Sequence, residues 1–529
     1  MFSWYDYLQP GIRDVVPKNY TVFGNISVDK LVERHKPVVD PLLNIITPWK
    51  QDVYAPAEWG KEAYTNMFDK FSFAEPQQLK KNFPEIFSVA TEVVMIEYSY
   101  MENSVILDMH CTVKNVESTP AFPKFLEYAS EEDYLRDCGM REYVEVWNCT
   151  QRKRPLWWTF LKYETLKKAK IEKGDIRMIM CTDPVFTRFG ACFEQHQNEL
   201  MKDKTESHYA QIGWTPFYGG IDQRLKRLSS IGNQVVETDW TRFDGTIPNE
   251  VFRTIKDIRW FYHGSKYKTP ENKDRYDWYV SNLMTKMVLL PTGEVTCIKN
   301  GNPSGQISTT TDNNMVNTFL TAFELAYFHQ KQHGTIPTAK EIRENFDMLV
   351  YGDDRLMTVN KNFVDYKLVN LPDFYKDVMG MWMKPENVKV LSSFEGASFC
   401  GFTFTKTSAG WVGTPNVDKI LSTLSKPVRA LPDVTALWGK LLSLRILVEN
   451  SADDVKRYLE KQIFRVREFA QAEGIELPEV PDYFYSRLWS GGPKNYVGSE
   501  ATACQTSEAE KTAPKERRER GRHHFKSKG

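Results

Sequence analysis

Two adjacent carboxylates at a tight turn are the residues of this sequence whose types and spacing point most directly to chemistry. The run FDMLVYGDDRLMTV, residues 346–359, places Asp353 and Asp354 after Gly352, between two apolar segments. This pattern predicts a β-hairpin whose two-residue turn begins with Gly352, because the first central position needs a positive φ. Two neighbouring anions repel each other, so such a turn calls for a counter-charge such as a divalent metal ion. The alternative is an ordinary exposed acidic turn, since a Gly-Asp-Asp triplet occurs by chance in roughly one chain in ten of this length.

A third carboxylate strengthens the case for a metal site. Asp239 and Asp244 lie in the run QVVETDWTRFD, residues 234–244, where Val235 and Val236 predict a strand that ends in a turn. A carboxylate at the end of one strand, placed beside a hairpin that carries two more, forms a hard oxygen-ligand site suited to Mg²⁺ or Mn²⁺. Sites of this kind hold metals in pairs for in-line displacement at phosphorus.

A loop rich in glycine, proline and serine separates these two stretches. It reads GNPSGQISTTTDNNMVN over residues 301–317 and runs into an apolar-periodic helix through Phe319, Leu320, Phe323 and Phe328. A loop that opens a helix presents small side chains and free backbone N–H groups. These groups suit an anion or a sugar.

Cations are concentrated in one segment ahead of the carboxylates. Residues 162–180 read KYETLKKAKIEKGDIRMIM and turn at a Gly-Asp pair. The alternation beyond this turn predicts a strand that directs Arg177 away from an apolar face. The alternative is a solvated helix with Glu-Lys pairs at helical spacing, for which Glu164 and Lys168 qualify.

Sequence periodicity also predicts the elements that follow the hairpin. Residues 374–383 predict a helix, and Lys384 begins a loop that holds Lys389. Residues 398–404 alternate like a strand, and residues 437–447 and 455–470 have the periodicity of helices. From Gly491 onward, small and charged residues dominate, which predicts a disordered basic tail.

Composition limits what the whole chain can be. Its 529 residues are enough for a multi-part enzyme with a large core. The 69 basic and 69 acidic residues balance, so contact with a polyanion has to come from local patches. The 8 cysteines are scattered singly, which favours free thiols over disulfides or zinc. No stretch is long and apolar enough to span a bilayer, so we expect a cytosolic protein.

The order of these motifs resembles that of the palm motifs A, B and C in RNA-dependent RNA polymerases of positive-strand RNA viruses. The wording DWTRFDGTIP, PSGQISTTTDNN and YGDDRLM is most similar to that of the astrovirus polymerases, within the picornavirus-like group. The resemblance implies an α+β right-hand fold of fingers, palm and thumb, with a palm of antiparallel sheet backed by helices. It implies fingers with an N-terminal extension over 1–230, palm over 231–250, fingers again over 251–300, palm over 301–412 and thumb over 413–490, followed by the tail over 491–529.

The resemblance also implies roles for the acidic residues and for one lysine. Asp239 and Asp353 would hold two divalent ions, Mg²⁺ or Mn²⁺, and Asp354 would assist as a further ligand at the edge of the site. Lys389, with Lys384 as the alternative, would donate a proton to the leaving pyrophosphate.

A second set of residues would bind the incoming nucleotide. Lys170 and Arg177 match the cations that line the nucleotide entry channel in the family, and a triphosphate carries negative charge that two metals only partly offset. Asp244 would accept a hydrogen bond from the ribose 2′-hydroxyl, with Asn313, Thr309 and Ser304 completing the sugar pocket.

The function expected from these residues is that of an RNA-directed RNA polymerase of a positive-strand virus. Its partners would be template and nascent RNA, NTPs, other viral replication proteins and, as a further candidate, a protein primer. We expect it in the host cell cytoplasm, recruited to membrane-associated replication complexes through partners. The competing functions are a reverse transcriptase, which would carry an aromatic residue in place of Asp244, a non-catalytic RNA-binding protein and a replication scaffold.

Overall fold

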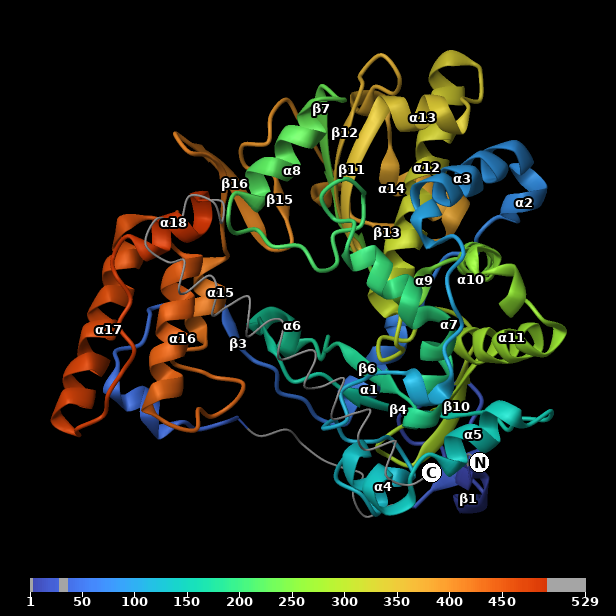
Figure 1. Ribbon diagram of the computed structural model, residues 1–529, viewed down its shortest axis with the longest axis horizontal. Coiled ribbons are helices and arrows are strands. Elements are labelled where there is room, and N and C mark those ends of the chain that lie inside the picture. The colour runs from blue at the N-terminus through green and yellow to red at the C-terminus, as the bar shows by residue number, and fades with distance from the viewer. Residues whose placement is uncertain (1–2, 28–36, 492–529) are drawn as a thin grey trace.

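The computed structural model describes residues 3–27 and 37–491 and combines helices with mostly antiparallel strands (Figure 1). The expected α+β class is therefore confirmed. The predicted tail lies outside the described residues apart from Gly491. Within the described residues, no helix is both long and apolar enough to cross a bilayer, and the seven described cysteines are all free thiols.

Five sheets organise the described chain. The one that carries the acidic motifs has the order β11-β12-β7-β14 and is antiparallel throughout. The largest has the order β1-β2-β10-β9-β4-β6, and only its β4–β9 pair is parallel. The strands are β1 (Leu8–Gln9), β2 (Gly24–Ile26), β3 (Tyr54–Pro56), β4 (Leu156–Leu161), β5 (Thr165–Lys167), β6 (Met178–Cys181), β7 (Gln234–Thr238), β8 (Trp240–Thr241), β9 (Lys286–Leu289), β10 (Glu294–Ile298), β11 (Phe346–Tyr351), β12 (Asp354–Val359), β13 (Trp382–Met383), β14 (Lys389–Leu391), β15 (Ser398–Phe399), β16 (Phe402–Thr407) and β17 (Gly410–Thr414).

Helices pack against these sheets, and those near the C-terminus share a core of their own. The α-helices are α1 (Glu62–Met67), α2 (Leu79–Asn82), α3 (Pro84–Glu97), α4 (Glu131–Cys138), α5 (Arg141–Asn148), α6 (Lys168–Glu172), α7 (Pro184–Lys202), α8 (Gly220–Ser229), α9 (Phe243–Thr246), α10 (Asn249–Tyr262), α11 (Pro270–Met284), α12 (Thr309–His333), α13 (Ala339–Asn345), α14 (Leu371–Phe374), α15 (Val417–Ser422), α16 (Val434–Leu447), α17 (Asp453–Ala472) and α18 (Phe484–Ser490).

The β11-β12-β7-β14 sheet is buried on both faces. Along β11 and β12, Met348 and Met357 belong to the main core, which they share with α12 and α3. Leu349 and Leu356 point the other way, into a second core shared with α8 and with the β15-β16-β17 sheet. Because successive side chains in a strand alternate between faces, two covered faces require apolar residues at nearly every position. This explains why both arms of the hairpin read as unbroken apolar runs.

The helical region near the C-terminus has its own core, and an N-terminal segment completes that core. Helices α16 and α17 stand apart from the acidic sheet at the left of Figure 1, and they confirm the helices predicted at 437–447 and 455–470. Ile46 and neighbouring residues pack into the core between them. The ring centroids of Trp49 and Tyr458 are 5.1 Å apart, and the Thr47 N–H donates to Gln462 Oε1 over 2.8 Å.

Two predicted boundaries are wrong because the chain reverses direction at left-handed residues. The helix expected over residues 374–383 ends at Met379, since Gly380 has φ 68° and the chain then pairs with β8 as β13. The strand expected over residues 398–404 is a hairpin, because Cys400 and Gly401 have φ values of 51° and 80° and form a two-residue turn between β15 and β16. Alternation along a sequence does not reveal so short a turn.

Two further boundaries shift because polar residues are used inside the fold. Helix α12 begins at Thr309, inside the segment expected to be a loop, and its polar first turns are buried among hydrogen-bonding partners. Lys389 lies on strand β14, paired with β7, and not in a loop. The alternative of a helical Glu164–Lys168 pair is wrong, because Glu164 lies outside any helix and pairs with Arg177, whereas Lys168 pairs with Asp52.

Candidate active site

Strand register brings the predicted carboxylates to one edge of the acidic sheet. The last pair between β7 and β12 joins Thr238 to Arg355. Asp239 and Asp354 are the next residues on these two strands, and they therefore lie across from each other at the same edge. Asp353 is in the turn just before Asp354, where Gly352 has φ 62° as the predicted turn requires.

Helix α12 holds this turn through two asparagines that sequence reasoning did not single out. Asn314 Oδ1 accepts the Gly352 N–H over 2.7 Å, and Asn317 Nδ2 donates to the Gly352 carbonyl over 3.0 Å. The two asparagines are three positions apart, so they share one face of the helix. Their spacing was visible in the sequence, but their partner was not. Both polar groups of the Gly352 backbone are thus satisfied by side chains of α12.

Asp354 is turned toward the β15–β16 hairpin. Its Oδ2 accepts the backbone N–H of Cys400 over 2.6 Å. Burial raises the pKa of Asp354 to about 7, and the charges of Asp353 and Asp239 raise it further, while the Cys400 hydrogen bond opposes the shift. One oxygen of the Asp354 carboxylate is therefore already bonded to the backbone.

Asp239 and Asp353 remain exposed to solvent at the sheet edge. Surrounding protein nevertheless raises both pKa values by desolvation, and the charge of Asp239 raises the pKa of Asp353 further. The charges of Lys170 and Lys384 lower the pKa of Asp239, so these two cations lie within electrostatic reach of it. Two carboxylates that repel each other in a desolvated setting favour a bound cation.

The chemistry of these donors fits a hard divalent ion, although the three aspartates do not form a closed cage. Among the described residues, no three His, Cys, Asp or Glu side chains converge closely enough to enclose a metal by themselves. Mg²⁺ is commonly bound through one or two carboxylates, with water and substrate phosphates as its other ligands. Asp239 and Asp353 supply two such carboxylates. They would hold Mg²⁺ or Mn²⁺ with substrate oxygens, and Asp354 lies at the edge.

The predicted sugar pocket is assembled only in part. Asn313 Nδ2 donates to Asp244 Oδ1 over 2.7 Å, and burial raises the pKa of Asp244 to about 7. The other two predicted residues bond elsewhere. The Thr309 hydroxyl donates to the Pro303 carbonyl over 2.9 Å, and the Ser304 hydroxyl donates to the Met178 carbonyl over 3.0 Å. Both hydroxyls bond within the loop or to β6, and neither forms a hydrogen bond with the Asp244 carboxylate.

The predicted triphosphate-binding cations face the carboxylates, and one of them already has an anionic partner. Arg177 forms a bidentate pair with Glu164, at 2.9 and 2.8 Å. The charge of Arg177 also lowers the pKa of Asp353 and Asp244, which places its guanidinium near both. Lys170 is exposed on α6 and acts on Asp239 as described above. A triphosphate at this position would compete with Glu164 for Arg177.

Of the two candidate lysines, Lys384 lies nearer to the acidic edge. Lys389 Nζ is 3.6 Å from Glu237 Oε2, its cross-strand neighbour. The pairing of Met383 with Trp240 makes Lys384 the residue opposite Asp239. The resemblance favoured Lys389, but the register of two short strands places Lys384 opposite Asp239.

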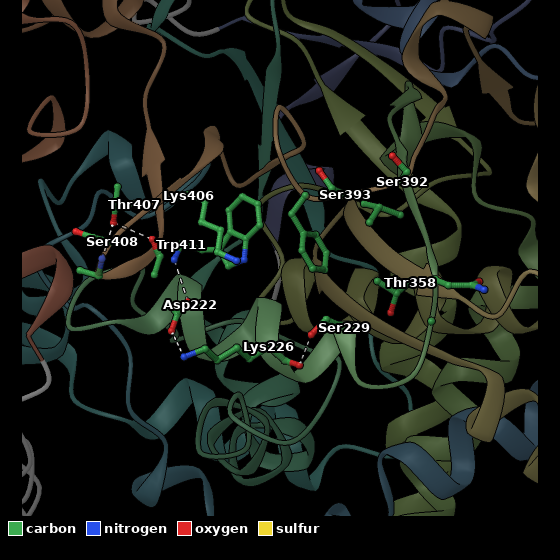
Figure 2. Close-up of a pocket in the computed structure, with 16 residues that line it drawn as sticks. Asp222, Lys226, Ser229, Thr358, Ser392, Ser393, Lys406, Thr407, Ser408 and Trp411 are labelled. Carbon is green, nitrogen blue, oxygen red and sulfur yellow. Dashed lines mark hydrogen bonds and ion pairs between the residues drawn. The ribbon is translucent and has the colours of Figure 1, made fainter.

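A cavity of about 620 Å³ lies at the opposite end of the acidic sheet. Figure 2 shows part of its lining, where the Trp411 backbone N–H donates to Asp222 and Asp222 pairs with Lys226. Val235 and Thr358 pair with each other and line it, three or more residues along their strands from Asp239 and Asp354. This cavity is therefore separate from the site of the carboxylates.

A right-hand polymerase is the class of protein that this sheet, its helical layers and its acidic edge define. The fold is similar to that of the Sicinivirus 3Dpol RNA-dependent RNA polymerase, with a TM-score of 0.64, 16% sequence identity and coverage of 91% of this chain and 98% of that one. The viral RNA-dependent RNA polymerase family matches residues 12–463. This chain therefore belongs to the viral RNA-dependent RNA polymerase family.

Its relatives are astroviral. The chain is 54% identical over 491 residues to the non-structural polyprotein 1AB of Turkey astrovirus 1, covering 92% of this chain and 30% of the polyprotein. It is 48% identical to that of Avian nephritis virus 1 and 38% identical to that of Human astrovirus-1, again over 92% of this chain and over 32% and 34% of those polyproteins. The chain thus spans about a third of the length of these relatives.

Proposed function

We propose that this chain extends RNA on an RNA template by nucleotidyl transfer, and so replicates and transcribes a positive-strand viral genome. The observation that carries the proposal is the convergence of Asp239 and Asp353 at one sheet edge, beside the Asp244–Asn313 pair. In the reaction, the 3′-oxygen of the growing strand bonds to the α-phosphorus of an NTP. The bond to the bridging oxygen breaks, the 3′-hydroxyl proton is lost and pyrophosphate leaves.

Two divalent ions bound at this edge would lower the pKa of the 3′-hydroxyl and offset the charge of the triphosphate. Asp239 and Asp353 would hold and orient these ions, and Asp354 would support them from the rim. Arg177 and Lys170 would bind the triphosphate. Lys384, or Lys389 as the resemblance favours, would donate the proton that the pyrophosphate takes up.

Asp244 would select ribonucleotides. Its Oδ1 is engaged by Asn313, and a ribose 2′-hydroxyl could donate to its other oxygen. A deoxyribose lacks that donor, so a buried acceptor would stay unpaired. That outcome costs roughly 1–3 kcal/mol.

The proposed partners follow from this reaction and from the polyprotein setting of the relatives. They are template RNA, nascent RNA, NTPs and other viral replication proteins, with a protein primer as a further candidate. We place the chain in the host cell cytoplasm, brought to membrane-associated replication complexes by these partners.

A primer-extension assay tests the proposal. The purified chain is incubated with a homopolymeric RNA template, an oligonucleotide primer, labelled NTPs and Mg²⁺ or Mn²⁺. We expect extension that EDTA abolishes, and none by Asp353→Asn, because that variant loses one ligand charge while its RNA binding and thermal stability are retained. Asp454→Asn, at an exposed position in α17, is the matched control and should extend normally. Near-normal synthesis by Asp353→Asn would refute the assignment.

A further inference from the structure

A line of three buried side-chain amides runs from Asp244 into the protein interior. Asn313 Nδ2 donates to Asp244 Oδ1 over 2.7 Å. Behind it, Asn302 Nδ2 donates to Asn313 Oδ1 over 2.9 Å, and Gln306 Nε2 donates to Asn302 Oδ1 over 2.9 Å. The exposed fractions of Asn302, Gln306 and Asn313 are 2%, 8% and 4%, so water does not compete for these bonds. We call Asn313, Asn302 and Gln306 the amide relay.

The inner end of the amide relay is fixed by a buried ion cluster. Gln306 Nε2 also donates to Asp312 Oδ2 over 2.8 Å. Asp312 is fully buried. Its Oδ2 is 2.5 Å from Lys256 Nζ, and its Oδ1 is 2.8 Å from Arg259 Nε. A carboxylate paired with two cations in this way serves as an acceptor of hydrogen bonds.

This fixed end sets the orientation of every amide in the relay. Because Asp312 only accepts, Gln306 must present its amino group to it, and the same amino group meets Asn302 Oδ1. The amino group of Asn302 then faces Asn313, whose oxygen accepts and whose amino group is left for Asp244. A rotated Asn313 amide would place two acceptors face to face, which is unfavourable in a buried setting.

Asn302 also fixes the backbone at both ends of this contact. Its own N–H donates to the Asp244 carbonyl over 2.7 Å, and its side chain donates to the Thr309 carbonyl over 3.2 Å. One residue thus ties the segment after β8 to the first turn of α12. The position of the Asp244 carboxylate relative to Asn313 is therefore set by Asn302.

We propose that Asn302 and Gln306 are positioning residues for ribose selection, which act by holding the Asn313 amide with its amino group toward Asp244. With Oδ1 of Asp244 occupied by Asn313, the other carboxylate oxygen stays available for the 2′-hydroxyl of an incoming NTP. This inference rests on the proposed function. It assigns the choice of sugar to residues that do not touch the nucleotide.

Single-nucleotide incorporation by Asn302→Ala and Gln306→Met tests the proposal. For each, kcat/KM is measured with an NTP and with the 2′-dNTP of the same base. We expect the preference for NTP to fall by about tenfold, since one oriented hydrogen bond to a charged group is at stake. The change should appear as a higher KM for the NTP, with incorporation of the dNTP little altered. Loss of structure alone would instead lower kcat/KM for both the NTP and the dNTP.

Asn198→Ala is the matched control. Asn198 is also a buried amide. It bonds to Arg259 and to the Ser308 hydroxyl, and it makes no hydrogen bond to a member of the amide relay. Its removal should leave the preference unchanged. A drop as large as that of Asn302→Ala would show that any damage to the ion cluster relaxes selection, and would overturn the specific role of the relay.

A double-mutant comparison separates this inference from the function it rests on. In an Asp244→Ala background, Asn302→Ala should cause no further loss of preference, because the relay then has nothing to position. Additive losses would overturn the proposal, as would an unchanged preference in folded Asn302→Ala and Gln306→Met. If Asn302→Ala does not fold, Gln306→Met decides the question. If the parent shows no primer extension, the proposed function itself is overturned. If the parent prefers NTP over dNTP and the variants keep that preference, only the positioning role of the amide relay is overturned.

Discussion

At the residue scale, the acidic edge is built from carboxylates with different surroundings. Asp239 and Asp353 stay open to solvent, Asp354 is capped by the Cys400 N–H, and Asp244 is held by Asn313. Burial raises the pKa of all four. Their partners, more than their residue type, separate the proposed metal-binding role from the sugar-binding role.

Asp244→Ala should relax the preference for NTP over 2′-dNTP. The substitution removes the proposed acceptor for the 2′-hydroxyl, so we expect a loss of about tenfold in the ratio of kcat/KM values, mainly through weaker NTP use. Steady-state incorporation of matched NTP and dNTP measures it. Unchanged discrimination would count against a sugar-sensing role.

The two candidate proton donors can be separated by a pair of substitutions. Lys384→Met should lower kcat by about a hundredfold, the low end for loss of a general acid, because Lys384 faces Asp239. Lys389→Met should lower it much less, because Lys389 is already paired with Glu237. Methionine keeps most of the apolar stem in both variants. Pre-steady-state incorporation rates provide the comparison. A larger defect in Lys389→Met would favour Lys389 as the proton donor, as the resemblance implies.

At the element scale, helices α3, α12 and α13 anchor the acidic hairpin. Helix α12 holds the Gly352 turn by two asparagines, and its Glu324 pairs with the buried Arg355 at 3.1 Å. Glu97, at the end of α3, accepts the Tyr209 N–H over 2.8 Å and pairs with Arg343 of α13 at 3.0 Å. Elements far apart in the sequence are thus joined by buried polar contacts around one sheet.

The contact of Glu97 predicts a pH-dependent stability. Burial raises the pKa of Glu97 from 4.5 to about 7, with Arg343 opposing the shift. The folded chain therefore holds this proton more tightly than the unfolded chain does. Protonation stabilises the fold at low pH, and that contribution, on the order of 3 kcal/mol, is lost as pH rises from 4.5 to about 7.

Glu97→Gln should flatten this dependence, because an amide does not titrate. Tm measured at several pH values between 4.5 and 7.5 should fall more steeply with rising pH for the parent than for the variant. Glu92→Gln, at an exposed position of the same helix, is the control and should follow the parent. Parallel curves for the parent and Glu97→Gln would contradict the assignment.

At the scale of the whole molecule, an N-terminal segment joins the helical region near the C-terminus. Residues 41–49 contribute Ile46 to the core between α16 and α17, and Tyr458 donates its hydroxyl proton to the Thr47 carbonyl. The chain between these two regions builds most of the strands and the acidic site. The contact thus joins two segments that lie near opposite ends of the described chain.

Ile46→Ala should weaken this link. Its side chain is only 6% exposed, and truncating a buried isoleucine costs about 2–5 kcal/mol. If α16 and α17 help to retain the template, the variant should release it earlier and make shorter products in a single binding event. Product length in the presence of a heparin trap measures this effect. Val39→Ala, at a position that is 83% exposed, should behave like the parent. Equal product lengths for all three proteins would contradict a role of this contact in template retention.

The sequence by itself determined the parts of this protein that depend on near neighbours. The Gly352 turn, the strand before Asp239 and the helices α16 and α17 were all predictable, because turn chemistry and apolar periodicity act within a few residues. The order of the acidic motifs was enough to indicate the polymerase family.

Tertiary structure alone decided which of the candidate residues meet. It paired Arg177 with Glu164 and placed Lys384 and not Lys389 opposite Asp239. It gave the Ser304 and Thr309 hydroxyls carbonyl partners other than Asp244. It also joined Asn302 to Asn313 in the amide relay. Such contacts follow from strand register and from the need to satisfy every buried polar group, and both depend on segments that are distant in the sequence.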